Sequence, residues 1–140
     1  MYCPMGERES RALLREGKVG RLGCCDQGKP YVVPVNYFYD GEFVYVHSLL
    51  GHKVDVLHTN PQACLQTDAV EDDYHWRSVT AFGRFEEVTE GKERERILNI
   101  LFKRLPHLSP VETRMIRGLP EVIVFRLRIE RITGVSEDWH

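Results

Sequence analysis

Short apolar runs that end in turns are the feature that most restricts the fold of this chain. Residues 31–39 are rich in Val and Tyr, Asp40-Gly41 follows as a strong hairpin-turn signal, and residues 42–47 are apolar again. Near the C-terminus, residues 121–132 alternate apolar and polar side chains, as in a strand with one buried face. We therefore expect a mainly β chain with antiparallel pairing.

The other expected elements extend this pattern to six strands interrupted by a few helices. Ile97, Leu98 and Leu101 recur at helical spacing. Helices are expected at 7–16, about 51–60, 90–105 and 113–117. Strands are expected at 18–24, 31–39, 42–47, 63–67, 77–88 with a bulge or bend at Gly83, and 121–132. The order predicts a small, six-stranded, mostly antiparallel barrel with helices packed outside, in one domain spanning residues 1–140.

Composition and charge restrict the class of function. The net charge is −2, whereas a general nucleic-acid binder normally carries a basic excess. No apolar run approaches the roughly 18 residues that a membrane span needs, and MYCPMGERES lacks the layout of a signal peptide. We expect a cytoplasmic protein that binds neither nucleic acid nor membrane.

The four cysteines are Cys3, Cys24, Cys25 and Cys64, and none forms a C-x-x-C pair. Reduced, packed thiols are the simplest interpretation, although Cys24-Cys25 could be redox-active. His47, His52 and His58 lie near one another in sequence but do not have zinc-site spacing. No metal site is therefore expected.

A candidate anion site lies in HSLLGHKVD, where an expected strand gives way to a helix. The first turn of a helix carries unpaired N–H groups and partial positive charge. His47, Ser48, His52 and Lys53 add donors, and Gly51 allows close approach to the backbone. These groups suit a phosphate monoester. The alternative is that Lys53 is a surface residue and Ser48 a helix cap.

Pro34, within an otherwise strong strand, is the second unusual feature. Proline cannot donate to a sheet ladder, so it indicates an edge strand or a bulge. Backbone groups left free there, together with the amide of Asn36, could bond a flat heterocycle. A plain edge strand with Asn36 facing water is the alternative. Arg77, farther along, suits a phosphate or carboxylate, but equally a salt bridge to Glu71, Asp72 or Asp73.

Together these stretches resemble a known family. The motifs, in order, are VGRLG, GKPYVVPVNYFYDGEFVYVHS, GHKVDVL followed by NP, and WRSVTAFGRFEEV. Their order and spacing are similar to those of the FMN-binding split-barrel proteins related to pyridoxamine 5′-phosphate oxidase. Within that family, the chain looks most like the branch that contains the nitroimidazole-resistance proteins.

The resemblance implies a six-stranded antiparallel split barrel that forms a homodimer with FMN at the subunit interface. By similarity, Lys53 and His52 would hold the FMN phosphate, and His47 and Ser48 would line the same pocket. The segment expected beside the isoalloxazine ring and ribityl chain comprises Tyr31, Val32, Val33, Pro34, Val35 and Asn36. Ser78 would contact the flavin, reaching it from the partner subunit. His52 departs from the family pattern, which has an arginine there.

The function implied is that of a flavoprotein reductase acting on a small electron acceptor, for which a nitro-aromatic compound is one candidate. Pyridoxamine-phosphate oxidase activity itself is not expected, because the chain ends soon after Trp139, before the substrate-binding segment of those oxidases. A non-catalytic flavin- or haem-binding protein is the alternative. Trp139 could cover a flavin or the dimer partner, or simply pack on the surface.

Overall fold

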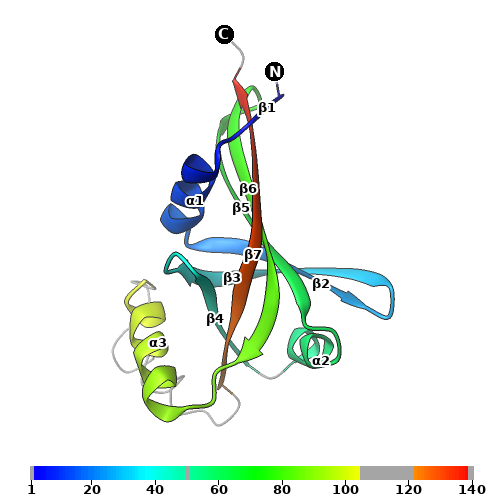
Figure 1. Ribbon diagram of the computed structural model, residues 1–140, viewed down its shortest axis with the longest axis vertical. Coiled ribbons are helices and arrows are strands. Elements are labelled where there is room, and N and C mark those ends of the chain that lie inside the picture. Colours follow the sequence, from blue (N-terminus) through cyan, green and yellow to red (C-terminus); the bar gives the residue numbers. More distant parts are fainter. Residues whose placement is uncertain (1, 50, 105–121, 139–140) are drawn as a thin grey trace.

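Figure 1 shows a computed structural model in which residues 2–49, 51–104 and 122–138 are described. The elements in chain order are β1 (Tyr2–Pro4), α1 (Glu7–Glu16), β2 (Val19–Asp26), β3 (Lys29–Tyr39), β4 (Phe43–Leu49), α2 (His52–Thr59), β5 (Gln62–Asp72), β6 (His75–Glu87), α3 (Gly91–Lys103) and β7 (Val122–Asp138). The expected helix at 113–117 and the side chain of Trp139 lie outside the described residues.

Six of the strands form a ring in which every pairing is antiparallel. The sheet order is β1-β7-β4-β3-β2-β5-β6, and an additional β6–β7 pairing closes the ring from β7 round to β6. The expected six-stranded barrel is therefore confirmed. The seventh strand, β1, was not expected; its three residues pair with the end of β7.

The ring is incomplete between β3 and β4. These strands pair only over Tyr37–Tyr39 and Val44–Val46, as Tyr37↔Val46 to Tyr39↔Val44. On its other side, β3 pairs with β2 over eight positions, from Lys29 to Asn36. Within the described residues, the edge of β3 from Lys29 to Asn36 that faces away from β2 therefore has no strand partner. We call this unpaired part of the ring the split.

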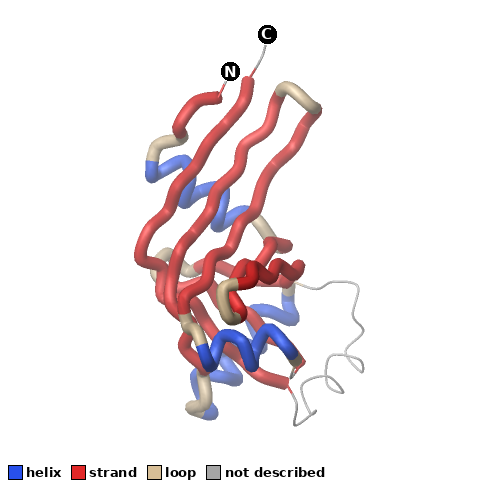
Figure 2. Tube along the Cα trace, turned by 90° about the vertical axis from the view of Figure 1, so that its right-hand side faces the viewer, coloured by secondary structure: helices blue, strands red, loops and turns tan. Residues whose placement is uncertain are grey.

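Two strands are much longer than the sequence patterns predicted. β5 runs to Asp72 and β7 to Asp138, so that β5, β6, β7 and β1 continue beyond the barrel as an extended sheet (Figures 1 and 2). Glu71 and Asp72 belong to β5 although the apolar pattern ends before them, and Asp72 still pairs with His75. Acidic residues are tolerated there because they are exposed near the turn at the end of the sheet.

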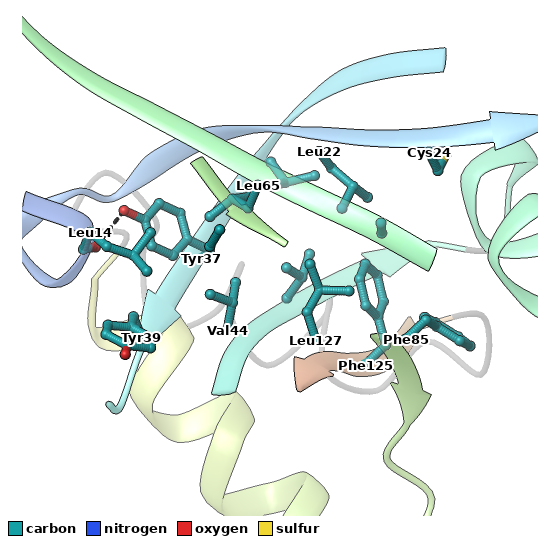
Figure 3. Packing of buried hydrophobic residues seen from close by; sticks show 14 of the residues in the cluster. Leu14, Leu22, Cys24, Tyr37, Tyr39, Val44, Leu65, Phe85, Phe125 and Leu127 are labelled. Atoms are coloured by element: carbon teal, nitrogen blue, oxygen red, sulfur yellow. Dashed lines mark hydrogen bonds between the residues drawn. The ribbon is translucent and has the colours of Figure 1, made fainter. Parts of the chain in front are cut away.

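One face of this extended sheet is covered by α1, whose Leu13 and Leu14 are buried. The core of the barrel lies between the strands and includes Leu22, Leu65 and Phe125, each fully buried (Figure 3). Tyr37 donates a hydrogen bond of 2.6 Å to the carbonyl oxygen of Leu14, which ties α1 to β3 (Figure 3). A second cluster packs α3 against the outside of β3, β4 and β7.

Two local predictions about the strands are confirmed. The β6–β7 register shifts between Phe82 and Gly83, as expected for a bulge at Gly83. Pro34 lies on an edge, not at a bulge, because the β2–β3 register is unbroken from Val19↔Asn36 to Asp26↔Lys29. Among the described residues, no helix is long and apolar enough to cross a membrane.

Candidate functional site

The backbone groups of β3 that face the split can be identified from two hydrogen bonds. Tyr37 N–H donates to Lys18 O on the β2 side, and Asp40 N–H donates to Phe43 O on the β4 side. Since hydrogen-bonding direction alternates along an antiparallel strand, the even-numbered residues of β3 point their backbone groups towards the split. Pro30 and Pro34 are among them, so neither proline costs a β2–β3 hydrogen bond.

The six residues expected beside a flavin ring divide between the two faces of β3. Tyr31 and Val33 pack against the barrel core, and Val35 is buried in it. Val32, Pro34 and Asn36 are exposed on the opposite face. The bonding groups of the split edge therefore include the Val32 and Asn36 amides, the Pro34 carbonyl and the Asn36 side chain.

His47 and Ser48 lie on β4, just beyond the point where β4 stops pairing with β3. On the other edge of β4, His47 pairs with Val124 of β7 and Ser48 pairs with Ile123. Ser48 is buried, and the ring of His47 contacts that of Phe102 at a centroid distance of 4.9 Å. The Nδ1 atom of His47 is buried and has no hydrogen-bond partner among the described residues. Such atoms are rare in folded proteins, and a water, an ion or a ligand is one partner that can satisfy them.

The electrostatics of His47 connect it to Lys53. Burial lowers the pKa of His47, and the positive charge of Lys53 lowers it further. Lys53 is half-buried in the first turn of α2. The structure thus brings together two of the predicted phosphate-binding groups, although they come from different elements.

The N-terminus of α2 adds backbone donors. Gly51 is its N-cap, and no side chain caps the helix. The N–H groups of Val54 and Asp55 donate to the carbonyl oxygen of Gly51. The amides of His52 and Lys53 precede them, in the turn where helical N–H groups lack intrahelical partners. His52 begins the helix, but its side chain lies outside what is described. The alternative role of Ser48 as the helix cap is not observed.

Ser78 lies away from this cluster, on β6. It accepts a hydrogen bond of 3.0 Å from Gln66 and pairs with Asp68 and Val135. Arg77 and Glu71 instead line a pocket of about 310 Å³ in the extended sheet. Among the described residues, no group of three or more His, Cys, Asp or Glu side chains could hold a metal ion.

A surface that the sequence patterns did not reveal runs across the outside of five strands. One row of paired residues is Pro34, Arg21, Gln66, Thr80 and Thr133; the next is Val32, Gly23, Cys64, Phe82 and Arg131. We call this surface the outer face. In the row between them, Leu22, Leu65 and Ala81 are fully buried on the inside. Only the strand register, which sequence reasoning could not supply, brings these residues together.

The cluster of His47, Lys53 and the α2 N-terminus can bind an anion, because it offers a charge, an imidazole nitrogen and backbone amides. The β3 edge beside it can bond a planar molecule with donors and acceptors. A group that carries a phosphate at one end and a heterocycle at the other fits both halves, and the unpartnered Nδ1 of His47 is the observation that favours it.

Comparison with known proteins agrees with this description. A protein of Rhizobium meliloti (strain 1021), the uncharacterized protein RA0666, is 32% identical over 139 residues, covering 93% of this chain and 91% of the relative. The crystal structure of a FAD-binding protein from Mesorhizobium loti is similar with a TM-score of 0.82 and 28% identity, covering 99% of both chains.

A candidate 5-nitroimidazole antibiotic resistance protein from Bacteroides thetaiotaomicron shares the fold, with a TM-score of 0.76 and 20% identity over 97% of this chain and 87% of that one. The family model described as pyridoxamine 5′-phosphate oxidase matches residues 6–136. The resemblance of the sequence motifs is thereby confirmed, and the chain belongs to the pyridoxamine 5′-phosphate oxidase-like split-barrel family.

Proposed function

We propose that this protein binds FMN at the split and uses it to reduce a small electron acceptor. The observation that carries the proposal is the buried, unpartnered Nδ1 of His47, where β4 runs past its last pairing with β3 and within electrostatic reach of Lys53. Family membership and the FAD-binding protein of Mesorhizobium loti support a flavin. The four cysteines are free thiols, which supports the further proposal of a cytoplasmic location.

Each part of the site has a separate role in this proposal. Lys53, His47 and the amides at the start of α2 hold the phosphate, while Ser48 lines the same pocket. Because the charge of Lys53 sits on a helix N-terminus, its effect on an anion adds to that of the helix dipole. Asn36 and the free backbone groups of β3 orient the ring system.

The chemistry itself is supplied by the flavin, which passes electrons from a donor such as NADH or NADPH to the acceptor. The residues of this chain position the ring and limit the access of water and substrate to it. A nitro-aromatic compound is one acceptor that fits the expectation from the family branch. We do not propose oxidation of pyridoxamine phosphate.

A homodimer is the second part of the proposal, with the flavin at the interface and Ser78 contributed by the partner. Ser78 lies on the outer face, away from the phosphate cluster of its own chain, so a second copy is the natural way for it to reach a flavin. Two large apolar side chains, Tyr2 and Val70, are exposed on the extended sheet, and Trp76 lies between them in the same row of paired residues. Exposed apolar residues grouped in this way are typical of an interface.

A titration of the protein with FMN, FAD and riboflavin tests the cofactor assignment. FMN should bind more tightly than riboflavin, because only FMN carries the phosphate that Lys53 binds. The substitution Lys53→Met should weaken FMN binding about tenfold or more, since a charge-assisted hydrogen bond contributes roughly 1.5–3 kcal/mol. The affinity for riboflavin should stay the same.

Lys92→Met provides the matched control, because Lys92 is exposed on α3. Equal loss of FMN and riboflavin affinity in Lys53→Met would show that Lys53 supports the fold and not the phosphate. Tighter binding of FAD than of FMN would reassign the cofactor, and no binding of any flavin would refute the proposal.

A non-catalytic binder of flavin or haem is the second candidate. The observation that favours it is again His47, since a neutral imidazole with a free nitrogen is also a common haem ligand. An absorption spectrum of the isolated protein separates the two cofactors. Steady-state turnover with NADH or NADPH separates an enzyme from a carrier, because a carrier binds flavin without turnover.

A further inference from the structure

A groove of about 380 Å³ lies on the outer face at one end of the β3 edge. Val32, Gly23, Cys64 and Phe82 form its floor, because they are consecutive partners across β3, β2, β5 and β6. Pro30 and Tyr31 also line it, so the same stretch of β3 borders both the groove and the split. A molecule in the groove would therefore lie next to the end of the split.

Gly23 gives the groove its depth. A Cβ atom at this position would come within 2.9 Å of the sulfur of Cys64, and real Cβ atoms essentially never approach that closely. Any larger residue would therefore displace Cys64 and alter the floor. Phe82 supplies an aromatic surface at the end of the floor, and the guanidinium of Arg131 lies 4.2 Å from the centroid of its ring.

The lining of the groove contains no charged side chain. It consists of apolar, aromatic, amide and thiol groups, and Arg131 is not part of it. Burial raises the pKa of Cys24 and of Cys64, so both remain neutral thiols at neutral pH. An anion or cation placed there would lose hydration without gaining a partner of opposite charge, which is costly.

We propose that this groove binds the electron acceptor and restricts it to uncharged, planar aromatic or heteroaromatic molecules. This inference rests on the proposed function, because it assigns the acceptor subsite of the same flavin site. The groove is large enough for a substituted single ring. The split offers Lys53 and His47 to a phosphate, whereas no charged side chain lines the groove, so the two halves of the site discriminate by charge.

Binding of two probes of nearly equal size tests the proposal. 4-Nitrobenzyl alcohol is neutral, whereas 4-nitrobenzoate carries a negative charge at neutral pH. Titration of the full chain, with and without FMN, should show the neutral probe binding about tenfold or more tightly than the anion, because only the anion loses charge hydration. Equal affinities, or a preference for the anion, would overturn the proposal.

Gln62→Lys provides a variant that should change the selectivity. Gln62 is exposed at the rim of the groove, at the start of β5, so a lysine there offers the anion a partner. The preference for the neutral probe should fall by about tenfold. Thr89→Lys, on an exposed position between β6 and α3, is the matched control and should keep the wild-type preference. An unchanged preference in Gln62→Lys would place the probe elsewhere and refute the assignment.

The flavin titration of the same samples separates this inference from the proposed function. Normal FMN binding without selectivity between the probes would refute the groove alone. Selective probe binding without any flavin binding would refute the proposed function and, with it, the role of the groove as an acceptor subsite. If only a monomeric sample binds the neutral probe, the groove is covered by a second copy of the chain, and the assignment also fails.

Discussion

At the scale of single residues, the protonation state of His47 determines how the site binds an anion. Burial and the charge of Lys53 both lower the pKa of His47. The imidazole is therefore neutral at neutral pH, and one of its nitrogens can donate a hydrogen bond. A bound phosphate would oppose both effects, because its negative charge favours the protonated ring.

The lowered pKa of His47 predicts a loss of stability in mild acid. Below about pH 6.5 the histidine of the unfolded chain takes up a proton, whereas the buried ring of the folded protein does not. The unfolded state then binds more protons, so the free energy of unfolding decreases as the pH falls. Urea unfolding at pH 7.5 and at pH 5.5 measures this decrease.

His47→Gln is the informative variant for this prediction, since the side chain of glutamine does not titrate. Its stability should fall less than that of the wild type over the same pH range. Saturating FMN should reduce the acid sensitivity of the wild type, because the phosphate raises the pKa of the ring. Identical pH profiles for the two proteins would show that other groups cause any loss.

At the scale of elements, β3 is a strand with two different edges. Its odd-numbered residues bond to β2, whereas the backbone groups of Pro30, Val32, Pro34 and Asn36 face the split. Proline at two of these four positions removes two N–H groups from an edge that could otherwise accept another strand. Natural proteins commonly protect exposed edges in this way.

The double substitution Pro30→Val and Pro34→Val should therefore convert the split edge into one that pairs. We expect the variant to form higher oligomers and to bind FMN at least about tenfold more weakly, because an added strand would occupy the edge. Size-exclusion chromatography and flavin titration measure the two effects. Val32→Thr leaves the edge backbone unchanged and serves as the control; a double variant that behaves like it would contradict the prediction.

The contact between α1 and β3 depends on Tyr37. This tyrosine is 1% exposed, and burial raises its pKa to about 12. The unfolded chain loses the tyrosine proton near pH 10, whereas the folded protein retains it, so stability is full below pH 10 and falls as the pH rises towards 12. The loss should approach about 3 kcal/mol.

Tyr37→Phe separates the hydrogen bond from the titration. Loss of the bond to Leu14 should cost about 1 kcal/mol at pH 7, and the unfolding free energy of the variant should decrease less above pH 10. Denaturant unfolding at pH 7, 10 and 11.5 measures both effects. An equally steep alkaline decline in the variant would assign the titration to another group.

Much of this architecture follows from local sequence patterns. Alternation and turn signals predicted the strands near their observed positions, and Pro34 predicted an edge or a bulge because proline affects the ladder directly; the edge is what the structure has. The extra length of β5 and β7 was missed, since polar residues such as Asp72 interrupt the apolar pattern while their backbones continue to pair. The groove was missed because Gly23, Cys64 and Phe82 come from three strands, and only the register aligns them.

At the scale of the whole molecule, apolar residues on the face of the extended sheet opposite α1 remain without cover in the described chain. One of its rows joins Tyr2, Glu137, Trp76 and Val70 across β1, β7, β6 and β5. Tyr2 is 67% exposed and Val70 is 65% exposed, although α1 buries the opposite face of the same sheet. A sheet with one face on the core and one apolar face exposed is suited to pair with a second copy.

Val70→Lys tests whether this surface forms the dimer. Since Val70 is mostly exposed, the substitution should change the stability of a single chain by no more than about 0.5 kcal/mol. In a dimer it would bury an unpaired charge, so dimerisation should weaken by about tenfold or more. Because the flavin is proposed to contact both subunits, FMN affinity should fall in parallel with the affinity of the two subunits for each other.

Sedimentation velocity over a range of protein concentrations, with and without FMN, measures this coupling, and Thr89→Lys is the charge-matched control. If Val70→Lys dissociates the dimer and FMN affinity stays the same, the flavin is bound within one chain and Ser78 has no part in the site.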